Sequence, residues 1–352
     1  MIRFARPYYH CPRCRASRLP WDETLRLSSQ ALTPAASQVA AQAGLLTSFR
    51  EASTETLRTM SGLSISESTV ERTTEAAGER LQERLAAGRT LGSREPWKWQ
   101  RDASGRTCAY VSCDHTGIRQ QGPGGRRAEG KMAGVGMVYN PRSEHDPERP
   151  PRRQVRYLAG FRDLSELGRQ LRREADAVGI MHAEQIVALC DGGQGLEDML
   201  LTFFPRATVI IDFWHVKEHL VELAEELCRD DAERKAWLHE WCHRLKHEGG
   251  SAVLAKLEEL PRDGWSASLA ELHRKTVGYF RNHRHKMDYP TYVARGWQIG
   301  SGPVESACKT VVGNRLKGGG MRWGSPGSDA VCHLRAAYLS EPLCWQTLWP
   351  PA

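Results

Sequence analysis

The chain has 352 residues, of which 40% are hydrophobic and 26% charged, and it carries a formal net charge of +7. This length allows two domains with an insertion. No apolar run reaches the length of a membrane span, and the N-terminal residues MIRFARPYYHCPRC lack the apolar core of a signal peptide. We therefore expect a cytoplasmic protein with no membrane partner. The net positive charge favours a polyanionic partner.

Cationic residues gather in two short stretches of the chain, a pattern that raises the expectation of phosphate contacts. A solvated face would show the same pattern. The stretches are Arg119, Arg126, Arg127 and Lys131, and then Arg149, Arg152, Arg153 and Arg156.

Two cysteines near the start, Cys11 and Cys14, have the spacing of a metal-binding pair. A CxxC supplies only two of the four ligands of a structural Zn²⁺ site, and no second pair follows at the spacing of a zinc ribbon. Residues 1–21 are thus interpreted as a CxxC segment, either the remnant of a zinc ribbon or a pair that binds nothing. The remaining cysteines are scattered, as is typical of free thiols.

Residues 22–97 are predicted to be a helical region. Thr33 before a proline is a typical helix start, Gly62 ends the next helical stretch, and Ser66 or Ser68 can cap a third helix. A helix, a glycine-marked turn and a serine-capped helix form the layout of a DNA-binding helix-turn-helix. A helical bundle that joins subunits has the same layout, but we interpret residues 22–97 as a DNA-binding region.

From residue 98 onward the pattern changes to buried strands. Strands are predicted at 107–113, 131–139, 154–161, 186–190 and 208–211, with helices at 164–178 and 196–204. Three of these strands end at Asp114, Asp191 and Asp212. Carboxyl ends of strands joined by crossover helices gather at one edge of a sheet, where sites form. An aspartate after a strand is often only a turn former, but three of them indicate a site.

The rest of the chain divides into three segments. Residues 217–297 are helical and highly charged, and they are interpreted as an insertion. Residues 298–339 return to the domain that begins at 98–216, and residues 340–352 form a tail. The predicted fold is an α/β domain with a mixed sheet, helices on both faces and an all-α insertion.

Glu305 follows a glycine–serine turn and begins a basic segment that contains Lys309, Arg315, Lys317 and Arg322. One carboxylate followed by cations suits a metal-bound carboxylate beside a phosphate backbone. A nucleotide-binding loop requires glycines where this segment has Pro303 and Cys308, so an ATPase is excluded. The order H-V-K-E-H at 215–219 differs from H-E-x-x-H and excludes a zinc protease of that type.

Nucleases and strand-transfer enzymes use two divalent ions, and hard ions such as Mg²⁺ prefer oxygen ligands. Aspartates after two separate strands and a glutamate on a later helix would supply those ligands. The element order of three strands, helix, strand, helix, strand, insertion and helix is that of a ribonuclease-H-like domain.

Four motifs give the chain a resemblance to DDE transposases of bacterial insertion sequences, of the ISKra type and related to the Mutator-like branch. They are CDHTG at 113–117, LCDGGQ at 189–194, FPRATVIIDFWHVKEHL at 204–220 and GSGPVESACKTVVGNRLKGGGMRW at 300–323. The N-terminal YYHCPRC and SFREA…SISESTVER segments also resemble this family, so the resemblance covers most of the chain.

The resemblance implies that Asp114, Asp191 and Glu305 bind two Mg²⁺ or Mn²⁺ ions. It implies that Asp212 and His215 form the D-x-x-H motif beside them. The residues alone leave Asp212 open as the second ligand, because it too ends a strand. Asp191 is preferred, since a Gly-Gly pair follows it and leaves its side chain open.

The expected function is that of a nucleoid-associated DNA transposase that acts on terminal inverted repeats and target DNA as a homodimer or larger assembly. Phosphate contacts are expected from Lys309, Arg315, Lys317 and Arg322. Two alternatives keep the same fold: a domesticated, non-catalytic DNA-binding protein and a simple nuclease.

Overall fold

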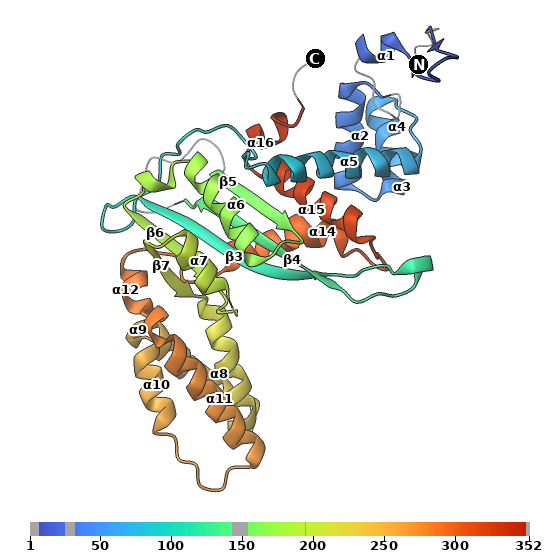
Figure 1. Ribbon diagram of the computed structural model, residues 1–352. Coiled ribbons are helices and arrows are strands. Elements are labelled where there is room, and N and C mark those ends of the chain that lie inside the picture. The colour runs from blue at the N-terminus through green and yellow to red at the C-terminus, as the bar shows by residue number, and fades with distance from the viewer. Residues whose placement is uncertain (1–6, 25–31, 143–153, 194, 350–352) are drawn as a thin grey trace.

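The computed structural model describes residues 7–24, 32–142, 154–193 and 195–349. A central sheet carries a helical region at one end, and a bundle of helices projects from the other end (Figure 1). A small hairpin of β1 (Tyr9–His10) and β2 (Ser17–Arg18), followed by α1 (Pro20–Thr24), lies beyond the helical region.

The sheet has five strands in the order β5-β4-β3-β6-β7. Their bounds are β3 (Cys108–Ile118), β4 (Lys131–Asn140), β5 (Gln154–Gly160), β6 (Gln185–Cys190) and β7 (Ala207–Ile211). The first three strands pair antiparallel, and β6 and β7 run parallel to β3. Parallel strands need crossover connections, which α6 (Leu164–Ala177) and α7 (Leu196–Phe203) supply. The predicted mixed α/β sheet is confirmed.

Helices cover both faces of the sheet, as predicted. Side chains alternate along a strand, so Tyr110 faces one apolar cluster while Ala109 and Val111 face the other. The Tyr110 side includes α15 (Ser325–Leu339), and the opposite side includes α6 and α7.

The first strand is longer than predicted. It was expected to end at Asp114, but β3 continues to Ile118 because β4 remains paired with it along that length. The paired strands extend past the rest of the sheet as a long hairpin (Figure 1). Asp114 therefore lies within a strand, two residues beyond Ser112, where the pairing of β3 with β6 stops.

The helical region follows the predicted start and stop signals. It comprises α2 (Pro34–Leu46), α3 (Phe49–Glu51), a π-helical turn (Ala52–Thr56), α4 (Leu57–Ser61) and α5 (Glu67–Ala86). Thr33 and Ser66 cap α2 and α5, and Gly62 ends α4 at φ 66°. A Cβ atom on Gly78 would lie 2.1 Å from the carbonyl oxygen of Ala330, so α5 crosses α15 at a point that only glycine permits.

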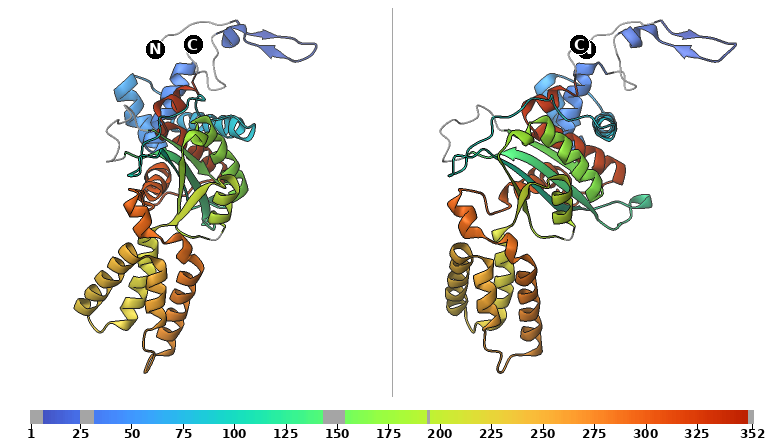
Figure 2. Two further views of the ribbon diagram at one scale, coloured as in Figure 1. Left: turned by 90° about the vertical axis from the view of Figure 1, so that its left-hand side faces the viewer. Right: turned by 60° about the vertical axis from the view of Figure 1, so that its left-hand side comes forward.

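The inserted helices begin at Phe213 instead of residue 217, because the carboxylate of Asp212 caps the helix directly after β7. The bundle contains α8 (Phe213–Leu227), α9 (Asp231–Glu248), α10 (Gly250–Glu258) and α11 (Ala267–His283), and α12 (Tyr289–Ala294) leads back to the sheet. Figure 2 shows the bundle standing away from the sheet. Within the described ranges, no helix has the length and apolar character needed to cross a membrane.

The chain then returns through α13 (Gly302–Ala307), a π-helical turn (Cys308–Gly313), α14 (Asn314–Leu316) and α15. The tail contributes α16 (Pro342–Gln346), and residues 350–352 of the predicted tail lie outside the described ranges.

Candidate active site

Three aspartates line up across the neighbouring strands β3, β6 and β7. Ser112 is paired with Leu189, and Cys190 is paired with Ile211. Continuing both registers sets Asp114 opposite Asp191 and Asp191 opposite Asp212. The alternation of each strand directs these side chains toward the face that holds Tyr110, Leu189 and Ile210. The sheet therefore gathers the three predicted aspartates in one row, which we call the aspartate row.

Helix α13 lies against this row and carries Glu305. At one end, the Ser301 hydroxyl contacts the carboxylate of Asp212 and lies 2.7 Å from Oε1 of Glu305. At the other end, the thiol of Cys308 donates a hydrogen bond to Oδ2 of Asp114 at 3.4 Å. Glu305 is exposed and lies between these two attachments. All four carboxylates thus belong to one edge of the sheet.

The three aspartates of the row differ in their burial and in the hydrogen bonds that their carboxylate oxygens already accept. Asp212 is 2% exposed and accepts the backbone N–H of Trp214 at 2.7 Å. Asp191 is half-buried and accepts one N–H, from Gly193, at 2.7 Å. Asp114 is half-buried and accepts the N–H of His115 at 2.6 Å. With the Cys308 thiol included, Asp114 and Asp212 each accept a donor on both oxygens, whereas Asp191 accepts a donor from the described residues on one oxygen only.

Three polar residues beside the row were not singled out by the sequence: Ser301, Cys308 and Tyr279. Burial raises the pKa of the Cys308 thiol, and the charge of Asp114 raises it further. The thiol consequently stays protonated and able to donate. Tyr279 comes from the bundle helix α11, and its buried hydroxyl has no hydrogen-bond partner within the described part of the chain. Burial raises the pKa of Tyr279, and the carboxylates of Asp191 and Asp212 add to the rise.

Divalent cations suit the donor chemistry of this edge. Carboxylates are the ligands that Mg²⁺ and Mn²⁺ prefer, and the buried Tyr279 hydroxyl beside them has no hydrogen-bond partner among the described residues. Ser301 has one proton but faces two carboxylates, so negative charge is in excess there. As they stand, no three His, Cys, Asp or Glu side chains of the described residues converge tightly enough to hold an ion. The ligands would have to close around it.

His215, the second member of the D-x-x-H motif, lies on α8 with its Nδ1 3.2 Å from the carboxylate of Glu218. Its ring is 5.5 Å from that of His219 between centroids. Burial lowers the pKa of His219, and His215 lowers it further. Asp212 and His215 thus both lie at the start of α8, but their side chains contact different residues.

Three of the four predicted phosphate-binding cations lie on the surface. Lys309, Lys317 and Arg322 are exposed, and the ammonium group of Lys317 hydrogen-bonds the Thr116 hydroxyl on β3. Arg322 lines a pocket of about 310 Å³ together with Arg119 and other residues of the loop that joins β3 to β4. Arg127 also lines this pocket, and none of its described lining residues is acidic. The first predicted basic stretch therefore meets the segment that follows Glu305.

Arg315 departs from the prediction of a phosphate contact. It is 3% exposed, its Nε donates to the carbonyl of Gly44 at 2.8 Å, and its guanidinium lies between the rings of Phe49 and Trp323. Burial lowers its pKa to about 10, with Arg335 as the next cause. Arg315 joins α2 to the sheet domain, and it cannot reach DNA from this position.

One residue of the second basic stretch, Arg156, also departs from the prediction of a phosphate contact. Arg156 is 1% exposed and pairs with Glu174 at 3.1 Å and with Glu341. A buried charge held by two carboxylates is structural. Arg149, Arg152 and Arg153 lie outside the described residues.

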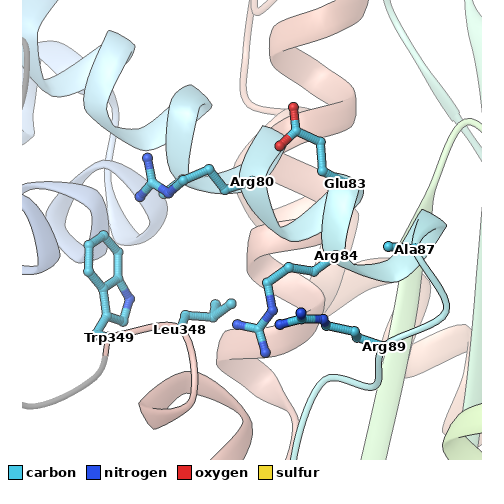
Figure 3. A pocket seen from close by; sticks show the side chains of 8 residues that line it. Arg80, Glu83, Arg84, Ala87, Arg89, Leu348 and Trp349 are labelled. Carbon is cyan, nitrogen blue, oxygen red and sulfur yellow. The ribbon is translucent and has the colours of Figure 1, made fainter.

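A further arginine-lined pocket, of about 500 Å³, lies where α5 meets the C-terminal tail (Figure 3). The guanidinium of Arg80 is 5.8 Å from the ring centre of Trp349, and Arg84 donates to the Thr347 carbonyl at 3.2 Å. Arg89 and Glu83 complete its charged lining. These contacts fasten the tail to α5, away from the aspartate row.

Cys11 and Cys14 lie in the turn of the β1–β2 hairpin, and both are exposed free thiols. Hydrogen bonds from the backbone and side chain of Cys14, and from the backbone of Arg13, lower the pKa of Cys11. A lowered thiol pKa favours the thiolate that binds zinc. The neighbouring His10 has its Nδ1 3.0 Å from the Ser17 hydroxyl. No set of three ligands forms within the described residues, so zinc binding stays a prediction.

A scan against protein-family models matches no family, and a search of curated proteins finds no matching relative.

Proposed function

We propose that this chain is a DNA transposase of the DDE type, which cleaves DNA at element ends and joins the new ends to target DNA. The observation that carries the proposal is that Glu305, about a hundred residues further along the chain, lies beside the aspartate row. The element order and the strand order β5-β4-β3-β6-β7 support a ribonuclease-H-like assignment for the sheet domain.

Asp114, Asp191 and Glu305 are the carboxylates that would hold Mg²⁺ or Mn²⁺. Such ions, when bound, activate an attacking hydroxyl and stabilise the leaving oxygen at phosphorus. Asp212 has a different role in this proposal: it caps α8 and, through Ser301, orients Glu305. The Cys308 thiol holds Asp114 from the other side until the ligands close.

The DNA contacts in this proposal come from the exposed cations next to the row. Lys309 and Lys317 lie on the segment that follows Glu305, and Arg322, Arg119 and Arg127 line a pocket at the loop between β3 and β4. Cations that neutralise phosphates make affinity depend steeply on salt.

The start of α5, the serine-capped helix of the predicted helix-turn-helix, is less favourable for DNA contact. Glu67 in its first turn and Glu71 in its second are both exposed. DNA end recognition by this region is therefore the weaker part of the proposal.

The proposal is tested with DNA that carries the inverted repeats flanking the coding sequence, incubated with Mg²⁺ or Mn²⁺. We expect strand nicks at the repeat ends and, with target DNA present, covalently joined products. Asp114→Asn and Glu305→Gln should each remove both products while leaving DNA binding in place.

Other outcomes separate the alternatives. Cleavage without joined products and without preference for repeat ends would indicate a simple nuclease. DNA binding without any metal-dependent product would indicate a non-catalytic DNA-binding protein.

A further inference from the structure

A cation-lined groove of about 460 Å³ runs between α8 and α9 of the bundle. Its lining includes Phe213, the residue directly after Asp212 of the aspartate row. Three lysines and three histidines line it, and none of its described lining residues is acidic. They are Lys217, Lys235, His239, His243, Lys246 and His247.

The groove lysines differ from the other cations of the same helix. On α9, Arg234 pairs with Asp231 at 2.6 Å, and Arg244 pairs with Glu240 at 3.6 Å and with Glu248 at 3.0 Å. Lys235 and Lys246 are exposed, and neither forms an ion pair with a described residue. The acidic residues of α9 thus neutralise its arginines and leave the groove face positive.

The third lysine links the groove to the site. The ammonium group of Lys217 is 5.1 Å from the ring centre of Trp214, a residue that is 57% exposed. Trp214 also donates its backbone N–H to Asp212. Lys217 is therefore the groove cation that lies nearest in sequence to the aspartate row, and Trp214 contacts both.

We propose that this groove binds the sugar-phosphate backbone of the DNA flanking the cleavage position. The inference rests on the proposed transposase function and adds a path for its substrate. Lys235, His239, His243 and Lys246 recur at helical spacing and so share one face of α9. Lys246 lies eleven positions after Lys235, which corresponds to about 16 Å at 1.5 Å per residue and matches about five nucleotides of one strand.

The test compares two double variants of the full chain that remove the same charge from the same bundle. Lys235→Ala/Lys246→Ala changes the groove. Lys256→Ala/Lys275→Ala changes two exposed lysines on α10 and α11 that are paired with Glu259 and Glu271. Binding of a fluorescent duplex is measured by anisotropy over a salt series, and circular dichroism checks that both variants fold.

The groove variant should lower the salt slope of the binding constant by about 2, so its loss of affinity between about 50 and 200 mM salt becomes about tenfold smaller than that of the parent. The control variant should keep the parent slope. Equal salt slopes for both variants would contradict DNA binding in the groove and leave the proposed transposase function untouched. A changed oligomeric state with an unchanged slope would show that the groove seats a second copy. A parent chain that binds no duplex would overturn the groove and the transposase together.

Discussion

The ends of β6 and β7 carry the same residue type at adjacent positions of one edge, yet the two aspartates have different fates. After β6, Asp191 is followed by Gly192 at φ 83° and a loop, and its carboxylate stays half-buried with one N–H donor. After β7, Asp212 is followed at once by α8, and its carboxylate is buried with the Trp214 N–H and the Ser301 hydroxyl.

The difference shows that the residues after a strand decide what its terminal aspartate does. A helix that starts directly after the strand offers free N–H groups, and a carboxylate that accepts them contributes about 1 kcal/mol as a cap. A glycine-rich loop makes no comparable demand, so one carboxylate oxygen of Asp191 is left without a donor from the described residues. The same edge thus holds one aspartate with an unused oxygen and one whose carboxylate is buried as a helix cap.

Replacing each aspartate in turn is the most direct test of their different roles. Asp191→Ala should lower metal-dependent cleavage on the order of a thousandfold, since a lost metal ligand removes several kcal/mol of transition-state stabilisation. Its free energy of unfolding should change by less than about 0.5 kcal/mol. Asp212→Ala should lose about 1–3 kcal/mol of stability, because it removes a helix cap and leaves buried donors unpaired.

Both variants are measured by cleavage of end-containing DNA and by urea unfolding at one temperature. Asp212→Asn is the control, since asparagine also caps helices well and should recover most of the stability. Retained cleavage in Asp191→Ala together with a folded but inactive Asp212→Ala would reverse the two roles.

The basic segment repeats this contrast with arginines. Arg315→Ala should destabilise the chain by about 3 kcal/mol, because it removes a buried hydrogen bond and two ring contacts that join α2 to the sheet domain. Arg322→Ala should leave the free energy of unfolding within about 0.5 kcal/mol of the parent and lower the salt slope of DNA binding by about 1. Urea unfolding and anisotropy titrations measure the two effects. A loss of DNA affinity in a fully stable Arg315→Ala would contradict the assignment of Arg315 to the core.

The sequence predicted the elements well where the signals are local. Thr33, Gly62 and Ser66 mark helix ends by side-chain caps and a left-handed glycine, and these depend only on neighbouring residues. The gathering of Asp114, Asp191 and Asp212 also followed from strand and crossover order, because parallel strands bring their carboxyl ends together.

Features that depend on distant partners were not predictable. Arg315 carries the same charge as its neighbours, and only the rings of Phe49 and Trp323 withdraw it from the surface. The strand with Asp114 runs on to Ile118 because β4 pairs with it there, a non-local effect. Tyr279 belongs to the helical bundle, 67 positions after Asp212, and no sequence motif indicates that it lies beside the site.

Ser301 contacts both the structural aspartate Asp212 and the proposed metal ligand Glu305. Its replacement should give the smallest effect of these substitutions. Its hydroxyl touches Asp212 and Glu305, and its proton can serve only one of them at a time. Ser301→Ala should cost about 1–2 kcal/mol in unfolding free energy through the buried Asp212 contact. Cleavage should fall about tenfold, since a misoriented Glu305 loses about 1.4 kcal/mol of transition-state stabilisation. Ser306→Ala, an exposed serine on the same helix, is the matched control and should change neither. Unfolding and cleavage are measured on both variants. A Ser301→Ala chain that loses stability but cleaves at the parent rate would limit Ser301 to holding Asp212 and leave Glu305 to be oriented by its own helix.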